Sequence, residues 1–344
     1  TKKVLSHAKR LHAIGAFCIG TNQIDLEECQ NKGIAVFNAP YSNTRSVVEL
    51  ALAEIVLLMR NLPDKIADMH AGKWSKSAKG SFEVRGKTLG IIGYGNIGSQ
   101  LSVLAETMGL KVVYYDLEEK LALGNAARCE SLEELLTKSD IITLHVDGRP
   151  ENKNMISDNE FELMKEGVIF LNLSRGHVVD VESLRKYSEE GKIGGIGIDV
   201  FPEEPMSNQD EFISELRKLP NTILTPHIGG STLEAQRNIA DFVPSRIMEY
   251  INTGSSSGSV NFPNIVLPSL KDAHRFIHLH FNEPGILAEI NQILAAHDLN
   301  IVGQYLKTNE KIGYVITDIN KNYSSDVIKE LKKIQGTIRF RVLY

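Results

Sequence analysis

The stretch KTLGIIGYGNIG, residues 87–98, decides the fold of this chain. It joins a short apolar run, typical of a buried strand, to a G-x-G-x-x-G turn that ends at Gly98. Apolar residues at helical spacing follow over 99–108, and a second apolar run at 111–115 ends at Asp116. Strand, glycine turn, helix, strand and acidic residue in this order predict a dinucleotide-binding βαβ unit.

Each glycine of this turn has an expected role. Gly93 makes the tight turn, Gly95 lets the backbone approach a pyrophosphate, and Gly98 lets the helix pack close to the sheet. Asp116 is expected to bind the adenosine ribose and to repel a 2′-phosphate, which favours NAD over NADP. An ordinary βαβ turn is the alternative. The residues expected to line the cofactor here are Tyr94, Gly95, Asn96, Ile97 and Asp116.

Composition excludes several classes of protein. At 344 residues the chain is long enough for two or three domains. A net charge of −5 without a basic stripe argues against nucleic-acid binding. The three cysteines fit no disulfide or metal-ligand spacing, which favours a reducing cytoplasmic setting and no metal site. No apolar run is long enough to span a membrane, and the first residues do not resemble a signal peptide.

Apolar runs and helical patterns alternate from residue 86 onward, which predicts an α/β fold with a Rossmann-type, doubly wound parallel sheet. Residues 43–46 are expected to cap a long helix, and another helix is predicted over 232–250. Residues 1–42 are interpreted as part of a flavodoxin-like domain. The strands predicted for the large sheet are 89–92, 112–115, 141–145, 168–173, 195–200 and 222–225.

The pattern changes after the linker-like segment GSSSGS at 254–259. The elements beyond it follow the order β-α-β-β-α-β, which predicts a small ferredoxin-like domain. We therefore expect three parts. They are a substrate-binding domain of residues 1–42 and 231–268, an NAD-binding domain of residues 43–230, and a C-terminal domain of residues 269–344.

Three charged residues follow predicted strands in the second half of the sheet: Arg175, Glu204 and His227. Ligands of open α/β sheets bind at this end of the strands. A histidine suits removal of a hydroxyl proton, a carboxylate orients its ring, and an arginine holds a substrate carboxylate. The three predict an oxidoreductase for 2-hydroxy acids, although Arg175 and Glu204 taken singly also fit a loop ion pair. His145 is interpreted as a pocket wall or a helix partner and not as the base.

The order of these motifs resembles that of the D-2-hydroxyacid dehydrogenase family. The resemblance rests on the turn at 93–98 with Asp116, then NLSRG at 172–176, DVF at 199–201 leading to Glu204, and PHIG at 226–229. It covers essentially the whole chain. Similarity to the bacterial, phosphoglycerate-oxidising members, which carry a C-terminal ACT domain, is seen at 17–23, 38–47 and 260–263.

The resemblance implies oxidation of 3-phosphoglycerate to 3-phosphohydroxypyruvate with NAD, the entry step of L-serine biosynthesis. It makes His227 the acid/base, Glu204 its partner and Arg175 the carboxylate binder. Asn43 would lie near the substrate. The other residues expected to contact the cofactor are His145, Asp199, His227, Gly229 and Gly230.

The resemblance also implies a homotetramer. Trp74 and Lys76 would reach the active site of a neighbouring subunit, with an ordinary interface aromatic as the alternative for Trp74. L-serine would inhibit by binding at ACT–ACT interfaces through His280, Asn282 and Asn300. Without the resemblance, the alternative is that Asn282 and Asn300 are turn residues and that His280 faces solvent.

Two departures from the family pattern stand out. The family has a longer N-terminal domain, so the natural protein is expected to extend before Thr1, where arginines for the substrate phosphate would lie. Asp147 replaces a proline that is usual in the family, in a loop that borders the cofactor.

Two other functions fit parts of the pattern: a glyoxylate or hydroxypyruvate reductase, and an NAD-sensing scaffold similar to the corepressors of this fold. The ACT-like part argues against the reductase, since a sensor belongs on a committed biosynthetic step. The intact set of Arg175, Glu204 and His227 argues against the scaffold.

Overall fold

A computed structural model describes residues 1–270 and 272–344 and divides the chain into two compact units. One unit is residues 43–236, and the other joins residues 1–42 to residues 237–344. The division falls within helix α9 (Leu233–Thr253). The three predicted domains, with boundaries after residues 42, 230 and 268, stay a prediction.

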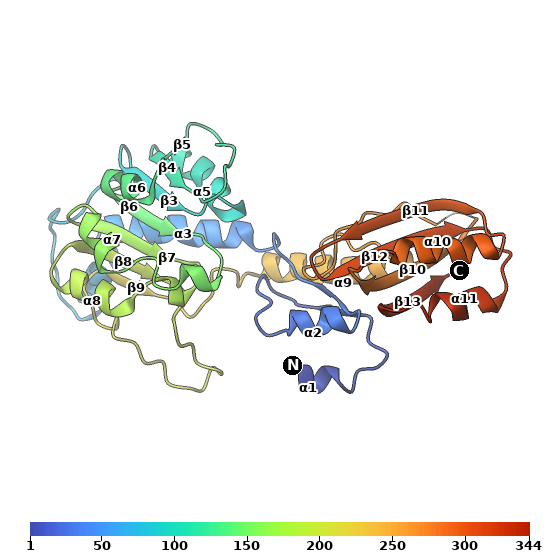
Figure 1. The fold of residues 1–344 in the computed structure, drawn as a ribbon. Coiled ribbons are helices and arrows are strands. Elements are labelled where there is room, and N and C mark those ends of the chain that lie inside the picture. The colour runs from blue at the N-terminus through green and yellow to red at the C-terminus, as the bar shows by residue number, and fades with distance from the viewer. Residues whose placement is uncertain (271) are drawn as a thin grey trace. The chain divides into compact units, whose positions relative to one another are not determined.

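A parallel sheet forms the centre of the 43–236 unit (Figure 1). Its strand order is β5-β4-β3-β6-β7-β8-β9, and every neighbouring pair is parallel. The doubly wound sheet predicted from the sequence is therefore confirmed, with one short edge strand, β5, that the pattern did not indicate. The strands are β3 (Thr88–Ile92), β4 (Lys111–Tyr115), β5 (Ala127–Arg128), β6 (Ile141–Leu144), β7 (Val168–Asn172), β8 (Ile193–Ile198) and β9 (Thr222–Leu224).

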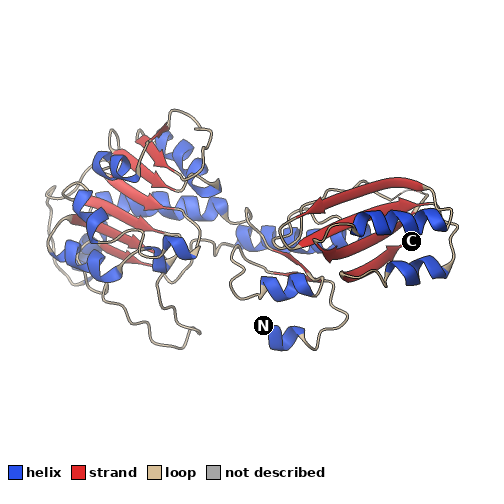
Figure 2. Cartoon of the chain, viewed as in Figure 1, coloured by secondary structure: helices blue, strands red, loops and turns tan. Residues whose placement is uncertain are grey.

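Helices cover both faces of this sheet, as Figure 2 shows, and this explains why its inner strands are almost wholly apolar. One core joins the sheet to α3 (Thr44–Met59) and α5 (Asn96–Thr107). The other core involves α6 (Leu132–Lys138), α7 (Asp158–Leu163) and α8 (Val181–Glu189). α4 (Leu62–His70) contacts α3 and β9. Short 3₁₀ turns lie at Pro150–Asn152 and Gly176–Val178.

The strand order creates a crevice at the carboxyl ends of β3 and β6. From β3 the chain continues to β4 and β5 on one side, and it then returns to β6 on the other. The connections after β3 and β6 therefore diverge, and ligands of such sheets bind at this switch point. The glycine turn follows β3 directly, so the topology places it at this crevice.

The second unit contains a four-stranded antiparallel sheet of order β11-β12-β10-β13. The predicted β-α-β-β-α-β order is confirmed. One face of the sheet packs on the two helices of this order, and the other packs on Phe37, Tyr250 and Phe262. Its elements are β10 (His274–Phe281), α10 (Ile286–Ala296), β11 (Ile301–Thr308), β12 (Ile312–Ile319), α11 (Ser325–Leu331) and β13 (Thr337–Leu343).

Residues 1–42 contribute a two-stranded parallel sheet of β1 and β2 to this unit. Strand β1 ends at Gly15, where a side chain would meet Val243 and Ile247. The elements of this segment are α1 (Lys2–Leu5), β1 (Ala13–Gly15), α2 (Leu26–Asn31) and β2 (Ala35–Phe37).

A buried ion pair lies in the antiparallel sheet. Arg275 on β10 is 0% exposed and donates two hydrogen bonds, of 2.6 and 2.7 Å, to the carboxylate of Asp318 on β12. Its Nη1 donates to the carbonyls of Thr253 and Pro268. The guanidinium therefore ties the end of α9 and the following segment to the sheet.

Replacing Arg275 by methionine is expected to leave the Asp318 carboxylate buried without its partner. We expect the free energy of unfolding to fall by about 3–5 kcal/mol, because the desolvation of the remaining charge is no longer offset by its partner. The double variant Arg275→Met/Asp318→Leu should recover most of the loss. Urea unfolding followed by circular dichroism measures both free energies, and a single-variant loss well below about 1 kcal/mol would contradict this role.

Candidate active site

The glycine turn after β3 lies at the crevice with an open surface. Gly93 has a φ of +91°, and a Cβ there would lie 2.6 Å from the carbonyl oxygen of His145, so both its backbone and its surroundings require glycine. A Cβ at Gly95 would meet nothing within 4 Å. Gly95 is the N-cap of α5, and Asn96 begins the helix with an exposed side chain. This open helix terminus suits a pyrophosphate, because its free N–H groups bind anions.

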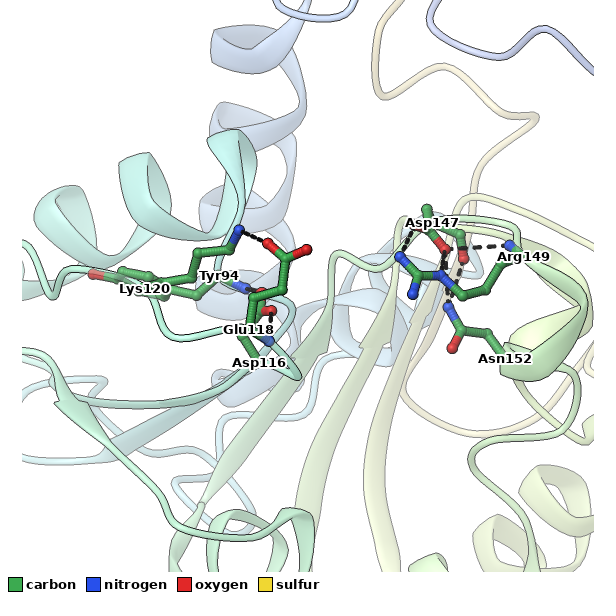
Figure 3. A network of polar contacts seen from close by, with 7 residues as sticks. All are labelled: Tyr94, Asp116, Glu118, Lys120, Asp147, Arg149 and Asn152. Carbon is green, nitrogen blue, oxygen red and sulfur yellow. Dashed lines mark hydrogen bonds and ion pairs between the residues drawn. The ribbon is translucent and has the colours of Figure 1, made fainter. Parts of the chain in front are cut away.

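Asp116 follows β4 and holds the glycine turn from the side. Its carboxylate accepts hydrogen bonds from the backbone N–H groups of Tyr94 (2.8 Å) and Glu118 (3.0 Å), as Figure 3 shows. The ring of Tyr94 is buried, stacks on Tyr114 with centroids 3.7 Å apart, and its hydroxyl lies 2.7 Å from Ser102 Oγ. Only the backbone of Tyr94 can therefore take part in the predicted cofactor contact. Together, the open turn and this carboxylate fit a dinucleotide.

The loop after β6 is organised by Asp147, the residue that departs from the family pattern. The Arg149 side chain donates two hydrogen bonds to its carboxylate, of 2.7 and 2.5 Å, and the Arg149 backbone N–H donates a third of 3.2 Å. Asn152 donates to the carbonyl and side-chain oxygens of Asp147 (Figure 3). The bond from Arg149 holds the pKa of Asp147 below its usual value. The side chains of Arg149 and Asn152 thus hold this loop around Asp147.

His145 begins the same loop and is neutral. Burial lowers its pKa to about 3, its Nε2 lies 3.0 Å from Thr143 Oγ1, and its Nδ1 is buried without a hydrogen-bond partner. A ring that does not protonate at neutral pH suits a pocket wall, which agrees with its exclusion as the base.

Arg175 follows β7 in a turn that Asn172 fixes. Asn172 is 1% exposed; its Oδ1 accepts bonds from the Ser174 backbone N–H (3.0 Å) and hydroxyl (2.7 Å), and its Nδ2 donates to the Arg175 carbonyl. Gly176 then packs so tightly on the backbone of Phe201 that no side chain fits between them. The arginine turn and the loop after β8 are thereby brought into contact.

Glu204 and His227 form a hydrogen-bonded pair. The Nδ1 atom of His227 lies 2.9 Å from Glu204 Oε2 and 3.1 Å from Oε1, and Glu204 Oε1 also accepts the Phe201 N–H. With the proton of the neutral ring on Nδ1, Nε2 is left as an acceptor. His227 has a φ of +54°, which is uncommon for a residue with a side chain and is typical of functional positions.

Asp199 anchors the loop that carries this histidine. It follows β8 and is 2% exposed. Its carboxylate accepts three hydrogen bonds, from the Thr225 hydroxyl (2.6 Å), the Ile228 N–H (2.7 Å) and the Gly229 N–H (2.8 Å). Both oxygens therefore accept hydrogen bonds from the 225–229 loop. Direct contact of Asp199 with the cofactor stays a prediction.

The other predicted substrate residues lie at two places. Asn43 precedes α3 as its N-cap but makes no capping bond; its side chain instead lies against Gly230, where a Cβ would come within 3.1 Å of its Cγ. Trp74 is 80% exposed, and Lys76 is exposed beside it.

Two of the three predicted effector residues, His280 and Asn282, lie at the C-terminal end of β10, whereas Asn300 lies at the opposite end of the sheet. His280 is buried, with its Nδ1 2.6 Å from the carbonyl of Phe281 and its Nε2 without a partner, so the alternative of a solvent-facing histidine is wrong. Asn282 donates to the carbonyl of Asn309, and Asn300 lies exposed before β11.

No helix in the part of the chain that the structure describes is long and apolar enough to span a membrane. Likewise, residues 1–270 and 272–344 hold no group of three or more His, Cys, Asp or Glu side chains that suits a metal ion.

Comparisons with known proteins agree on the family. Residues 52–229 match the D-isomer specific 2-hydroxyacid dehydrogenase NAD-binding domain, and residues 276–339 match the AHAS small subunit-like ACT domain. The D-3-phosphoglycerate dehydrogenases of Haemophilus influenzae and Escherichia coli K12 are 53% and 49% identical to the whole chain, which covers 84% of each. A D-lactate dehydrogenase of Aquifex aeolicus, solved with NAD and lactic acid, has a TM-score of 0.68 at 30% identity, over 77% of this chain and 84% of that one.

Replacing Asp199 by asparagine is expected to loosen the 225–229 loop. An amide offers one acceptor oxygen, so at least one of the Ile228 and Gly229 N–H groups loses its partner, at a cost of about 1–3 kcal/mol. Hydrogen exchange at these two amides should then be about ten to a hundred times faster. Thr225→Val is the matched control, because it removes a donor to the same carboxylate and leaves both backbone bonds. Unchanged exchange in Asp199→Asn would show that another group holds the loop.

Proposed function

The chain belongs to the D-isomer specific 2-hydroxyacid dehydrogenase family, and we propose that it oxidises 3-phospho-D-glycerate to 3-phosphohydroxypyruvate with NAD, the first step of L-serine biosynthesis. The observation that carries this proposal is the His227–Glu204 pair, which lies with the Arg175 turn at the carboxyl edge of the parallel sheet. The names of the similar enzymes, at about half identity over the whole chain, supply the substrate.

In the proposed mechanism, His227 takes the proton of the substrate hydroxyl. Its Nδ1–H donates to Glu204, which fixes the ring and stabilises the imidazolium that forms, so Nε2 is the atom that accepts the proton. Arg175 holds the substrate carboxylate and polarises the oxygen at the reacting carbon. Bound NAD supplies the acceptor for the hydride. In the reverse direction, His227 returns the proton to the carbonyl oxygen.

The proposed cofactor is NAD and not NADP. Asp116 lies beside the glycine turn and would accept hydrogen bonds from the ribose hydroxyls, whereas a 2′-phosphate would meet its negative charge. Gly95, Asn96 and Ile97 present the start of α5 to the pyrophosphate. The segment 227–230, anchored by Asp199, and the His145 loop complete the proposed site.

We further propose a cytoplasmic homotetramer in which Trp74 and Lys76 reach the site of a neighbouring subunit. The exposure of both side chains supports this role, since an ammonium group suits a substrate phosphate. L-serine is the proposed inhibitor, bound by His280, Asn282 and Asn300 at contacts between C-terminal domains. The buried, unpartnered Nε2 of His280 supports a ligand there.

Turnover tests the proposal. With NADH, 3-phosphohydroxypyruvate should be reduced with a kcat/KM well above those for glyoxylate and hydroxypyruvate, and L-serine should lower the rate. Loss of NADH absorbance at 340 nm measures the rate with each of the three substrates and the effect of L-serine on it. Equal efficiency with glyoxylate would favour a glyoxylate reductase, and no consumption of NADH would exclude the dehydrogenase.

The residue at the centre of the mechanism can be tested separately. His227→Gln removes the proton acceptor and should lower kcat by about 10²–10⁴-fold, the usual contribution of a general acid–base group. Half-buried His177, on the turn after Arg175, is the matched control, and His177→Gln should keep the wild-type rate. A near wild-type kcat in His227→Gln would assign the proton to another group.

A further inference from the structure

Glu54 is a carboxyl group buried in the core beneath the proposed active site. It lies in the third turn of α3, on the side that faces the sheet, and is 1% exposed. Both of its oxygens are buried without a hydrogen-bond partner in the described part of the chain. An ionised carboxylate without donors is very costly in such a place, so the position requires an uncharged acid or a special reason for the charge.

The backbone of β8 shows where this carboxyl points. A Cβ at Gly197 would lie 2.7 Å from Glu54 Oε2, so the acid lies directly against the strand, where glycine leaves room for it. Asp199 follows two residues later and points into the 225–229 loop. Burial, with the charge of Asp199 as a second cause, raises the pKa of Glu54 to about 8. At neutral pH, Glu54 is therefore largely uncharged.

Asp199 is the charged group that acts on Glu54. The elements that pack on α3 are α4, α5, β7, β8 and β9, and none of these three strands contains an ionisable residue. On α4, Asp64 is engaged elsewhere, by the N–H of Asn221. On α5, Glu106 accepts the N–H of Asn125.

The coupling between two acids is mutual. If the charge of Asp199 disfavours ionisation of Glu54, then an ionised Glu54 repels the Asp199 carboxylate by the same free energy. That anion is the acceptor of the three hydrogen bonds that hold the loop of His227. α3 also contacts this loop directly, because a Cβ at Gly229 would lie 3.5 Å from Val47 Cγ2.

We propose that Glu54 is a positioning residue for the His227 loop: uncharged, it leaves the Asp199 carboxylate in place to anchor the loop, and ionised, it repels that carboxylate, weakens the anchor and misplaces the histidine. The proposal rests on the proposed function for its kinetic consequence. It predicts that activity is lost at high pH for a reason that lies outside the reacting groups.

The oxidation of 3-phosphoglycerate separates this effect from the titration of the base. In that direction His227 must be unprotonated, so its own ionisation increases the rate as the pH rises. For the wild type, kcat should nevertheless fall by about tenfold between about pH 7.5 and 9.5. Glu54→Gln and Glu54→Met cannot ionise and should lose less than about twofold over the same range.

Glu49→Gln is the matched control. Glu49 lies on the same helix, is exposed, and pairs with Arg45, so this variant should follow the wild-type profile. Two different replacements of Glu54 are used because the glutamine amide finds no partner in the core, whereas methionine is apolar and similar in length. The same fall in kcat in both folded variants as in the wild type would overturn the proposal.

A second measurement needs neither cofactor nor turnover. In the protein labelled with ¹³C at histidine Cε1, and with His227→Gln used for assignment, the wild-type signal of His227 should show an inflection near pH 8 that is separate from the one caused by protonation of its own ring. Glu54→Met should abolish this separate inflection. If the separate inflection persists in Glu54→Met, the proposal is overturned even if both variants are inactive. No activity of the wild type at any pH would instead count against the proposed function and would leave this measurement valid.

Discussion

The carboxylate of Asp199 is the group on which the arrangement of the active site depends. It is buried at the end of β8, and each of its oxygens is used by the loop that follows β9. Hydrogen bonds to a charged acceptor are stronger than neutral ones, and burial increases this difference. This anchor stabilises the left-handed backbone of His227, which is otherwise disfavoured for a residue with a side chain.

The sheet brings the remaining groups to the same edge because all of its strands are parallel. Arg175 follows β7, Glu204 follows β8 and His227 follows β9, so consecutive strands deliver the three side chains to neighbouring loops. Contact between the first two loops requires close approach of backbones, which Gly176 permits. Catalytic geometry in this fold is therefore set by strand order and by a few positions without side chains.

Much of this could be predicted from the sequence, because the signals are local. The strand–turn–helix pattern around Gly93 and the acidic residue Asp116 lie within one βαβ unit, and apolar runs reveal buried parallel strands. The burial of the Tyr94 ring and of His280 could not be predicted, since it depends on partners brought in by tertiary packing. The anchor role of Asp199 depends on residues about 30 positions away.

The burial of the Glu54 carboxyl is the clearest example of a feature that the sequence could not predict. In the sequence, Glu54 is one charged residue within an otherwise apolar helix face, a pattern that usually places the charge at the edge of that face. The carboxyl can be buried because Gly197, which lies far away in the sequence, has no side chain where the carboxyl packs.

Three acids near the histidine loop thus occupy different environments, and their environments separate their roles. Glu204 is partly exposed and bonded to the imidazole, so it can respond to a proton on the ring. Asp199 is buried but fully hydrogen-bonded, so it can remain an anion with a structural task. Glu54 is buried without donors, so near neutral pH the uncharged form is the one this place accommodates. Because like charges at close range repel each other, the proposed role of Glu54 requires its uncharged form, which leaves the hydrogen bonds of Asp199 to the loop undisturbed.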